Sequence, residues 1–349
     1  MRKFLFLLLL ALSSTWALSQ GNYNVIKGER PTIDLEKVPT EAFEKGKIKI
    51  KLTTNMEKSI PDAMIKAGAN GFVVTGNSAI DELNKHFGAK QYKPLLWGLY
   101  ENSPKSEKYR ERHKAWGFHL WFELEISSDA DVKEAVKKFA ALGEIEIAEP
   151  VYKKRLISNV EPMDDPEGKG EGQNDKNAKW TPNDTRYSEQ WHYHNTGQQG
   201  GTIDKDIDLP EAWDIEKGLS SVIVAVVDGG IQTNHPDLAG NIWSGVGYNF
   251  VTNSSSLSAE DHGTHVAGTV AAVNNNGSGV AGVAGGSGSN DGVRLMSCQV
   301  FTSSSSGGFD QAPIFAADNG AAISQNSWGY TSVNVYDQAT LDAIDYFNS

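Results

Sequence analysis

The sequence predicts two successive folding units: a small α+β unit of ferredoxin-like order, then an α/β unit built on a doubly wound parallel sheet. The chain has 349 residues, 39 % of them hydrophobic, which is enough for about two cores of usual size. In the first half, apolar residues alternate with polar ones in several segments, as in half-buried strands. The second half contains a continuous Val-rich run and then alternating helix and strand patterns, as in sheets covered on both faces.

Residues 1–19 have the pattern of a secretory signal peptide. Arg2 and Lys3 precede an apolar run that is too short to span a bilayer. Ala17 and Ser19 are the small residues expected just before a cleavage site that follows Ser19. Because no later apolar run approaches membrane length, we expect a secreted, extracellular product without a membrane span.

Residues 20–157 are expected to form the α+β unit. Asn77 and Ser78 are both suitable as the helix N-cap, and Gly88 is placed to end the same helix. The predicted elements follow the order of a split βαβ unit. They are strands at 47–52, 118–126 and 144–152, helices at 77–88 and 129–143, and a further strand at 71–74.

Residues 158–180 are predicted to be a linker between the two units. The segment is acidic and rich in Gly, Pro and Asn, with almost no apolar side chains to bury. Exposed stretches of this kind are preferred sites of proteolytic cleavage.

Residues 181–349 are expected to begin a parallel α/β unit. The predicted elements are strands at 221–227, 293–301 and 321–327, and helices at 262–275, 309–320 and 337–348. In doubly wound sheets, ligands bind outside the carboxyl ends of the strands. Asp228 follows the first of these strands, and the segment 326–329 follows the third.

Charge is distributed unevenly along the chain, whose formal net charge is −12. Residues 20–160 carry 23 basic and 20 acidic residues, whereas residues 161–349 carry 7 basic and 24 acidic ones. A net negative chain is a poor nonspecific partner for nucleic acid, so we expect no nucleic-acid binding. Opposite charge on the two parts favours their docking on one another.

Asp228 and His262 carry the chemistry that the sequence suggests. Asp228 stands at the end of a buried strand, and His262 stands at the start of a helix 34 positions later. An imidazole held by a buried carboxylate has its tautomer fixed and its cationic form stabilised. Such an imidazole can accept a proton from a serine hydroxyl as a general base.

These segments resemble the motifs of the subtilisin-like serine peptidases, the subtilases. The resemblance is carried by "VVDGGIQTNHPDL" and "HGTHVAGTVAAVNNNGSGVAGVA", with "ISQNSWG" as the third segment, and it covers residues 185–349. A weaker likeness relates "EIEIAEPVY" to the last strand of the family's inhibitory propeptide. The resemblance implies a secreted endopeptidase made as a zymogen, with polypeptides as substrates and its own propeptide, residues 20–157, as intramolecular inhibitor.

The resemblance also assigns roles to individual residues. It makes Asp228 and His262 the first two members of an Asp-His-Ser triad. It places the backbone of Ser327, Trp328 and Gly329 beside an extended substrate, which would pair with it as an added strand. Gly229 departs from the Ser or Thr that the family more often has there.

The same family often binds a structural Ca²⁺, and no cofactor is required for its catalysis. The resemblance places that ion at Asp237, the Val273 carbonyl and Asn275, which are oxygen donors of the kind that Ca²⁺ prefers. The loop after the His262 helix is longer here than in the best-known members.

The family's nucleophile motif, of Gly-Thr-Ser-Met-Ala type, does not occur in the sequence, and only 87 residues follow His262. We expect an incomplete copy of a longer peptidase, whose 349 residues alone are inactive. One alternative is a catalytically inactive secreted protein that binds or inhibits through its propeptide-like unit. Another is an inactive scaffold.

Several residues that could suggest other chemistry are assigned structural roles. Cys298 lies in a strand pattern and is expected to be a buried hydrophobe. The histidines without an assigned function are His86, His113, His119, His192, His194, His235 and His265.

Overall fold

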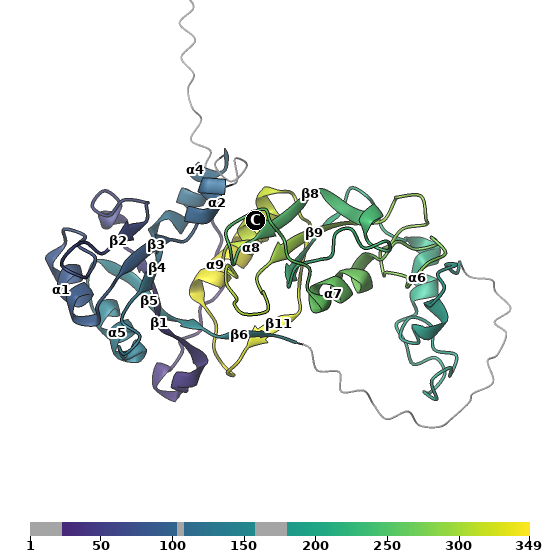
Figure 1. The fold of residues 1–349 in the computed structure, drawn as a ribbon, viewed down its shortest axis with the longest axis horizontal. Helices are drawn as coiled ribbons and strands as arrows, with labels where there is room; N and C mark the ends of the chain where they lie inside the picture. Colours follow the sequence, from purple (N-terminus) through teal and green to yellow (C-terminus); the bar gives the residue numbers. More distant parts are fainter. Residues whose placement is uncertain (1–22, 103–107, 158–179) are drawn as a thin grey trace, which may run out of the picture.

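The computed structural model describes residues 23–102, 108–157 and 180–349 (Figure 1). The predicted signal peptide and nearly all of the predicted linker lie outside the described residues. Residues 23–157, the N-terminal unit, and residues 180–349, the C-terminal unit, each contain a β-sheet. No helix in the three described ranges is both long enough and apolar enough to cross a bilayer.

The N-terminal unit is a five-stranded antiparallel sheet in the order β2-β3-β4-β1-β5. The strands are β1 (Phe43–Leu52), β2 (Ile65–Lys66), β3 (Gln91–Pro94), β4 (Trp121–Glu125) and β5 (Ile145–Tyr152). Helices α1 (Ser78–Phe87) and α5 (Val132–Ala140) share a core with one face of the sheet. The longer strands and these helices follow the β-α-β-β-α-β order of a split βαβ unit.

Two predicted strands of this unit need correction. Residues 71–74 are not a strand, although Val73 donates its backbone N–H to the Ala89 carbonyl. The strand expected at 118–126 begins only at Trp121, because Phe118–Leu120 form a 3-10 turn. The short apolar run at 71–74 gave no information on pairing, and β3 takes the place beside β4 instead.

Strand β1 is buried on both faces, whereas its alternating pattern predicted one exposed face. Ile48 and Ile50 face the helices, and Lys49 and Lys51 are only 6 % exposed on the opposite face. The opposite face lies against the C-terminal unit, where Lys49 Nζ donates to Asp310 Oδ2 at 2.5 Å.

The C-terminal unit has a parallel sheet in the order β10-β7-β9-β8. The strands are β7 (Ile223–Asp228), β8 (Ile242–Asn249), β9 (Arg294–Gln299) and β10 (Ile323–Asn326). The helices are α6 (Leu209–Ile215), α7 (Asp261–Ala271), α8 (Ala312–Asp318) and α9 (Gln338–Phe347). Helix α7 packs on one face of the sheet and α8 and α9 pack on the other, so the predicted doubly wound arrangement is confirmed.

A single core joins the two units. Helices α8 and α9 lie between the two sheets (Figure 1). Their buried side chains contact Val227 and Met296 on one side, and Trp116 and Trp121 of the N-terminal unit on the other. Helices α2 (Trp97–Asn102) and α4 (Arg110–Ala115) also belong to this interface. The remaining short 3-10 turns are at 35–37, 40–42, 54–56, 187–189 and 239–241.

A two-stranded sheet connects the ends of the two units. Strand β6 (Lys154–Leu156) pairs antiparallel with β11 (Trp328–Tyr330). The segment that leaves the N-terminal unit therefore lies along the carboxyl end of the parallel sheet, where Asp228 is also located.

Candidate active site

Asp228 and His262 form a hydrogen-bonded pair at the carboxyl end of β7. His262 Nδ1 and Asp228 Oδ1 are 2.7 Å apart, and the Gly229 N–H donates to the same oxygen at 2.7 Å. Asp228 is fully buried, whereas the His262 side chain is 20 % exposed. Burial raises the pKa of Asp228, although the bonds from His262 and Gly229 oppose that rise.

Two glycines explain why the pair can form. A Cβ on Gly263, in the first turn of α7, would lie 2.3 Å from the Gly229 carbonyl oxygen, so only glycine permits this approach. A Cβ on Gly229 would lie 2.8 Å from the Glu260 Cβ. The close contact between the helix start and the strand end accounts for the glycine at 229, where subtilases more often have Ser or Thr.

The second ring nitrogen of His262 faces a backbone carbonyl. His262 Nε2 lies 3.0 Å from the carbonyl oxygen of Ile157, which follows β6. With a carboxylate at one nitrogen and a carbonyl at the other, only the doubly protonated imidazolium satisfies both acceptors. Burial tends to lower the pKa of His262, but the bonds to Asp228 and Ile157 outweigh it and raise that pKa above its ordinary value.

The predicted substrate-binding segment is occupied by the chain itself. Ile157 donates its N–H to the Ser327 carbonyl at 2.8 Å, Leu156 lies opposite Trp328, and Arg155 lies opposite Gly329. Residues 154–157 thus run as an extended peptide along Ser327, Trp328 and Gly329 and end with the Ile157 carbonyl beside His262. The position of Ile157 could not be predicted from the sequence, because it depends on how the two units dock.

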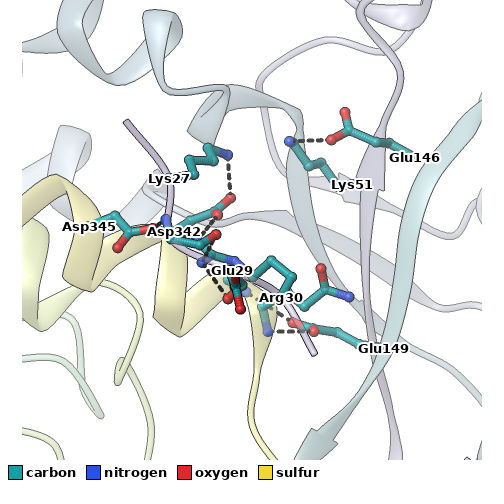
Figure 2. A network of polar contacts seen from close by, with 11 residues as sticks. Lys27, Glu29, Arg30, Lys51, Glu146, Glu149, Asp342 and Asp345 are labelled. Atoms are coloured by element: carbon teal, nitrogen blue, oxygen red, sulfur yellow. Dashed lines mark hydrogen bonds and ion pairs between the residues drawn. The ribbon is translucent and has the colours of Figure 1, made fainter. Parts of the chain in front are cut away.

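Charged side chains of the N-terminal unit anchor it to helix α9. Lys27 pairs with Asp342 at 2.8 Å, and Arg30 bridges Asp342 and Asp345 at 2.9 and 2.7 Å (Figure 2). Glu149 accepts hydrogen bonds from the first two backbone N–H groups of α9, at 2.7 and 3.3 Å. A carboxyl group at a helix N-terminus satisfies otherwise unpaired amides.

The pKa of Glu149 is far above its ordinary value. Its side chain is enclosed between β5 and α9, and the Asp337 carboxylate is nearby. Burial, with a smaller contribution from Asp337, raises the pKa of Glu149 to about 8, although Lys49 and the helix amides oppose that rise.

The residues predicted to hold Ca²⁺ lie in one loop cluster beside α7. Asp237 accepts hydrogen bonds from Asn276 Nδ2 at 2.7 Å and from the Val280 N–H at 2.9 Å. Val273 donates its N–H to the Asp237 carbonyl, and Asn275 adopts a left-handed backbone with φ 58°.

Asp184 completes this cluster, and the sequence analysis missed it. Its Oδ2 accepts from the Asn275 N–H at 2.7 Å, while its buried Oδ1 has no hydrogen-bond partner among the described residues. Burial and the nearby Asp237 raise the pKa of Asp184. The unpartnered carboxylate oxygen of Asp184, near the Asp237 carboxylate, is an oxygen donor of the kind that Ca²⁺ prefers. No group of three His, Cys, Asp or Glu side chains arranged for a metal occurs among the described residues.

The structure also places Cys298 and three of the histidines without an assigned function. Cys298 is fully buried, and burial raises the pKa of its thiol, so the predicted hydrophobic role is confirmed. His113 is buried at the interface of the two units, where its Nε2 lies 3.0 Å from Asp318. His192 and His265 line a cavity of about 640 Å³ behind α7, and burial lowers the pKa of His192.

Comparison with known proteins identifies what the second half of the chain resembles. Residues 220–348 match the model of the subtilase family. The chain is 38 % identical over 157 residues to the thermophilic serine proteinase of Bacillus sp. (strain AK1), covering 44 % of this chain and 35 % of the relative. Thermitase of Thermoactinomyces vulgaris is also 38 % identical, over 159 residues, covering 44 % of this chain and 50 % of the relative.

Structural similarity extends over most of the chain. Fervidolysin from Fervidobacterium pennivorans matches 89 % of this chain and 39 % of its own, with a TM-score of 0.51 and 21 % identity. At that identity the likeness concerns the fold alone. The chain spans about a third to a half of the length of the two curated relatives above.

Proposed function

Residues 220–348 match the model of the subtilase family of serine peptidases, and from that match we propose that this chain is the zymogen part of a secreted endopeptidase. The observation that carries the proposal is the position of the Ile157 carbonyl, 3.0 Å from His262 Nε2. The carboxyl end of a cleaved product would lie beside this nitrogen, on the side from which a serine hydroxyl would approach it.

The geometry supports acyl transfer through a serine. Asp228 fixes the ring of His262 and stabilises its cation, and His262 then removes the proton of a serine hydroxyl as that oxygen attacks the peptide carbonyl. The same proton passes to the leaving amine. The reaction needs a serine near His262 Nε2, and the 349 residues contain no nucleophile motif of the family's type.

The N-terminal unit would act as the inhibitor. It occupies the substrate cleft by adding strand β6 to β11, and it places an acceptor on the ring nitrogen that the serine would use. We infer that self-cleavage breaks the bond that follows the Ile157 carbonyl, at the start of the predicted linker.

The test uses the product of the complete gene, expressed up to its own stop codon. Mass spectrometry should find a mature form that begins at residue 158, and a fluorophosphonate probe should label it. His262→Ala should abolish both the processing and the labelling, whereas His86→Ala, on the N-terminal unit surface, should affect neither. Stable unprocessed protein without labelling would instead support the inactive, inhibitory alternative.

We also propose that the chain is exported through its first 19 residues. The charged start, the apolar run and the small residues before position 20 support this. A relative from Xanthomonas campestris, 39 % identical over 136 residues, is named an extracellular protease. Deleting residues 2–19 should keep the protein inside the producing cell.

Asp237, Asp184, Asn275 and the Val273 carbonyl are proposed to hold a structural Ca²⁺. The unpartnered Asp184 oxygen beside Asp237 supports the proposal. When bound, the ion would join the segment around 184 to the loop after α7 and would take no part in the reaction.

A further inference from the structure

Strand β6 carries Lys154, whose side chain is fully enclosed. Its Nζ forms an ion pair with Asp337 Oδ2, and the two side chains are only 2 % and 0 % exposed. A buried ammonium is tolerated only where a carboxylate and further polar contacts compensate for its lost hydration. The site around Asp337 supplies this compensation.

Aromatic rings complete the enclosure. Lys154 Nζ lies 4.9 Å from the centre of the Phe309 ring and 4.8 Å from that of Tyr330. Ring faces attract cations, and the attraction grows when water is excluded. The Tyr330 hydroxyl also lies 3.3 Å from Asp337 Oδ2, which holds the carboxylate in place.

The cations near Asp337 come from the N-terminal unit. Burial pushes the pKa of Asp337 up, but Lys154 and Lys49 outweigh it and hold that pKa below its usual value. Both lysines belong to β1 or β6, so both leave when residues 23–157 leave. Asp337 Oδ1 already lacks a hydrogen-bond partner among the described residues. The emptied site would therefore contain an aspartate that has lost both of its lysine partners.

We propose that Asp337, Phe309 and Tyr330 form a subsite that selects polypeptides with Lys or Arg as the fourth residue before the cleaved bond. This inference rests on the proposed function, in which residues 154–157 occupy the place of a substrate. Counted back from Ile157, whose carbonyl faces His262, Lys154 is that fourth residue. A neutral or acidic residue there leaves Asp337 without its cation.

Arg155 offers a matched control within the same strand. It carries the same charge as Lys154, and its backbone lies opposite Gly329, but its side chain is exposed. The neighbouring strand position therefore imposes no charge preference.

The first experiment needs no catalysis and uses the 349-residue chain. Amide hydrogen exchange at Ile157, whose N–H is bonded to Ser327, reports the docking of the strand. Lys154→Met should accelerate this exchange at least 10-fold, Lys154→Arg should largely restore protection, and Arg155→Met should change the rate less than 2-fold. In an Asp337→Asn background, Lys154→Met should add almost nothing. Equal effects of Lys154→Met and Arg155→Met would overturn the proposal.

The second experiment measures cleavage by the mature product of the complete gene. Peptides that share Arg-Leu-Ile before the cleaved bond carry Lys, Arg, Met or Glu in front of it. Lys and Arg peptides should have a kcat/KM at least 10-fold above Met and about 100-fold above Glu, and Asp337→Asn should equalise Lys and Met. Equal cleavage of all four peptides would refute the subsite while leaving the peptidase intact. If no peptide is cleaved, the proposed function fails, and the exchange experiment alone decides whether the pocket selects a cation.

Discussion

His262 is bonded at both ring nitrogens to acceptors that lie far apart in the sequence. Asp228 is 34 positions away and belongs to the same unit, whereas Ile157 is 105 positions away and belongs to the other. An imidazolium held in this way cannot accept a proton, so in the proposed zymogen the docked strand would block the base both chemically and sterically. Under that proposal, the contact between Ile157 and His262 would both inhibit the enzyme and mark where a substrate binds.

Glu149 should make the stability of the chain depend on pH. Burial raises its pKa from the usual 4.5 to about 8, so the folded chain binds this proton more tightly than the unfolded chain does. The associated stabilisation is complete below pH 4.5 and is lost as the pH rises towards 8. The melting temperature should therefore fall over that range in the native chain and fall less in Glu149→Gln.

Glu146 provides the control for this measurement. It lies on the same strand, and its half-exposed side chain pairs with Lys51 at 2.6 Å. Glu146→Gln should keep the pH dependence of the native chain. Identical pH profiles for Glu149→Gln and the native chain would contradict the assignment to Glu149.

Removal of Ca²⁺ should destabilise the loop cluster around Asp237. Burial, with a smaller contribution from repulsion by Asp237, raises the pKa of Asp184, and a bound cation would offset both effects. A chelator should lower the melting temperature of the native chain, and added Ca²⁺ should restore it. Asp184→Asn should weaken the response to Ca²⁺, and a chelator without effect on the native chain would rule out the ion.

Helix α1 shows how local sequence determines an element. Asn77 Oδ1 accepts hydrogen bonds from the N–H groups of Ala79 and Ile80, both at 3.1 Å. Gly88 ends the helix in the left-handed region with φ 63°, where residues with a Cβ are strained. The C-terminal boundary, and the N-terminal one to within one residue, were predicted from residue type alone, because capping depends on only the nearest few residues.

Replacing the cap should weaken the N-terminal unit by a measurable amount. Asn77→Ala removes both hydrogen bonds and should cost about 1 kcal/mol of the free energy of unfolding. Lys85→Ala, at an exposed position of the same helix, should change it by less than about 0.5 kcal/mol. Urea unfolding measures both, and equal losses would show that the cap does not stabilise the helix.

Strands without a regular alternation of apolar and polar residues could not be predicted from the sequence. Strand β8 contains Gly245 and Gly247, and its pairing with β9 shifts register between Ile242 and Gly247, so no alternation is visible. The Asp228–His262 pair could be predicted, because short motifs at the ends of a strand and a helix define it. Ile157 and Asp337 could not, because their roles arise only when separately folded segments meet.

At the scale of the whole molecule, the uneven distribution of charge along the chain corresponds to ion pairs between the two units. Lys27, Arg30, Lys49 and Lys154 of the N-terminal unit each pair with an aspartate of the C-terminal unit. Arg30 and its partner Asp345 keep about a fifth of their side chains exposed, whereas Lys49 and Asp310 are buried. Salt should therefore affect these pairs differently.

Ionic strength should separate the two kinds of ion pair. Arg30→Ala should destabilise the chain by about 1 kcal/mol or less at low salt, and the difference should vanish near about 1 M salt. Lys49→Met leaves Asp310 buried without its cation and should cost about 3–5 kcal/mol at either salt concentration. Chemical unfolding at both concentrations tests this, and a salt-sensitive Lys49→Met would show that water reaches Asp310.

The pairing of β6 with β11 also has a consequence for synthesis on the ribosome. The fully buried residues of the N-terminal unit's core lie between Ile48 and Ile145, so this core can close before strand β7 has been made. About 170 residues separate Ile157 from strand β11, which at roughly 5–20 residues per second means a delay of about 10–35 s. During that time β6 presents an unpaired edge that no other part of the chain has yet reached. The N-terminal unit can thus fold before the C-terminal unit has been synthesised, and it then provides the surface against which the C-terminal unit packs.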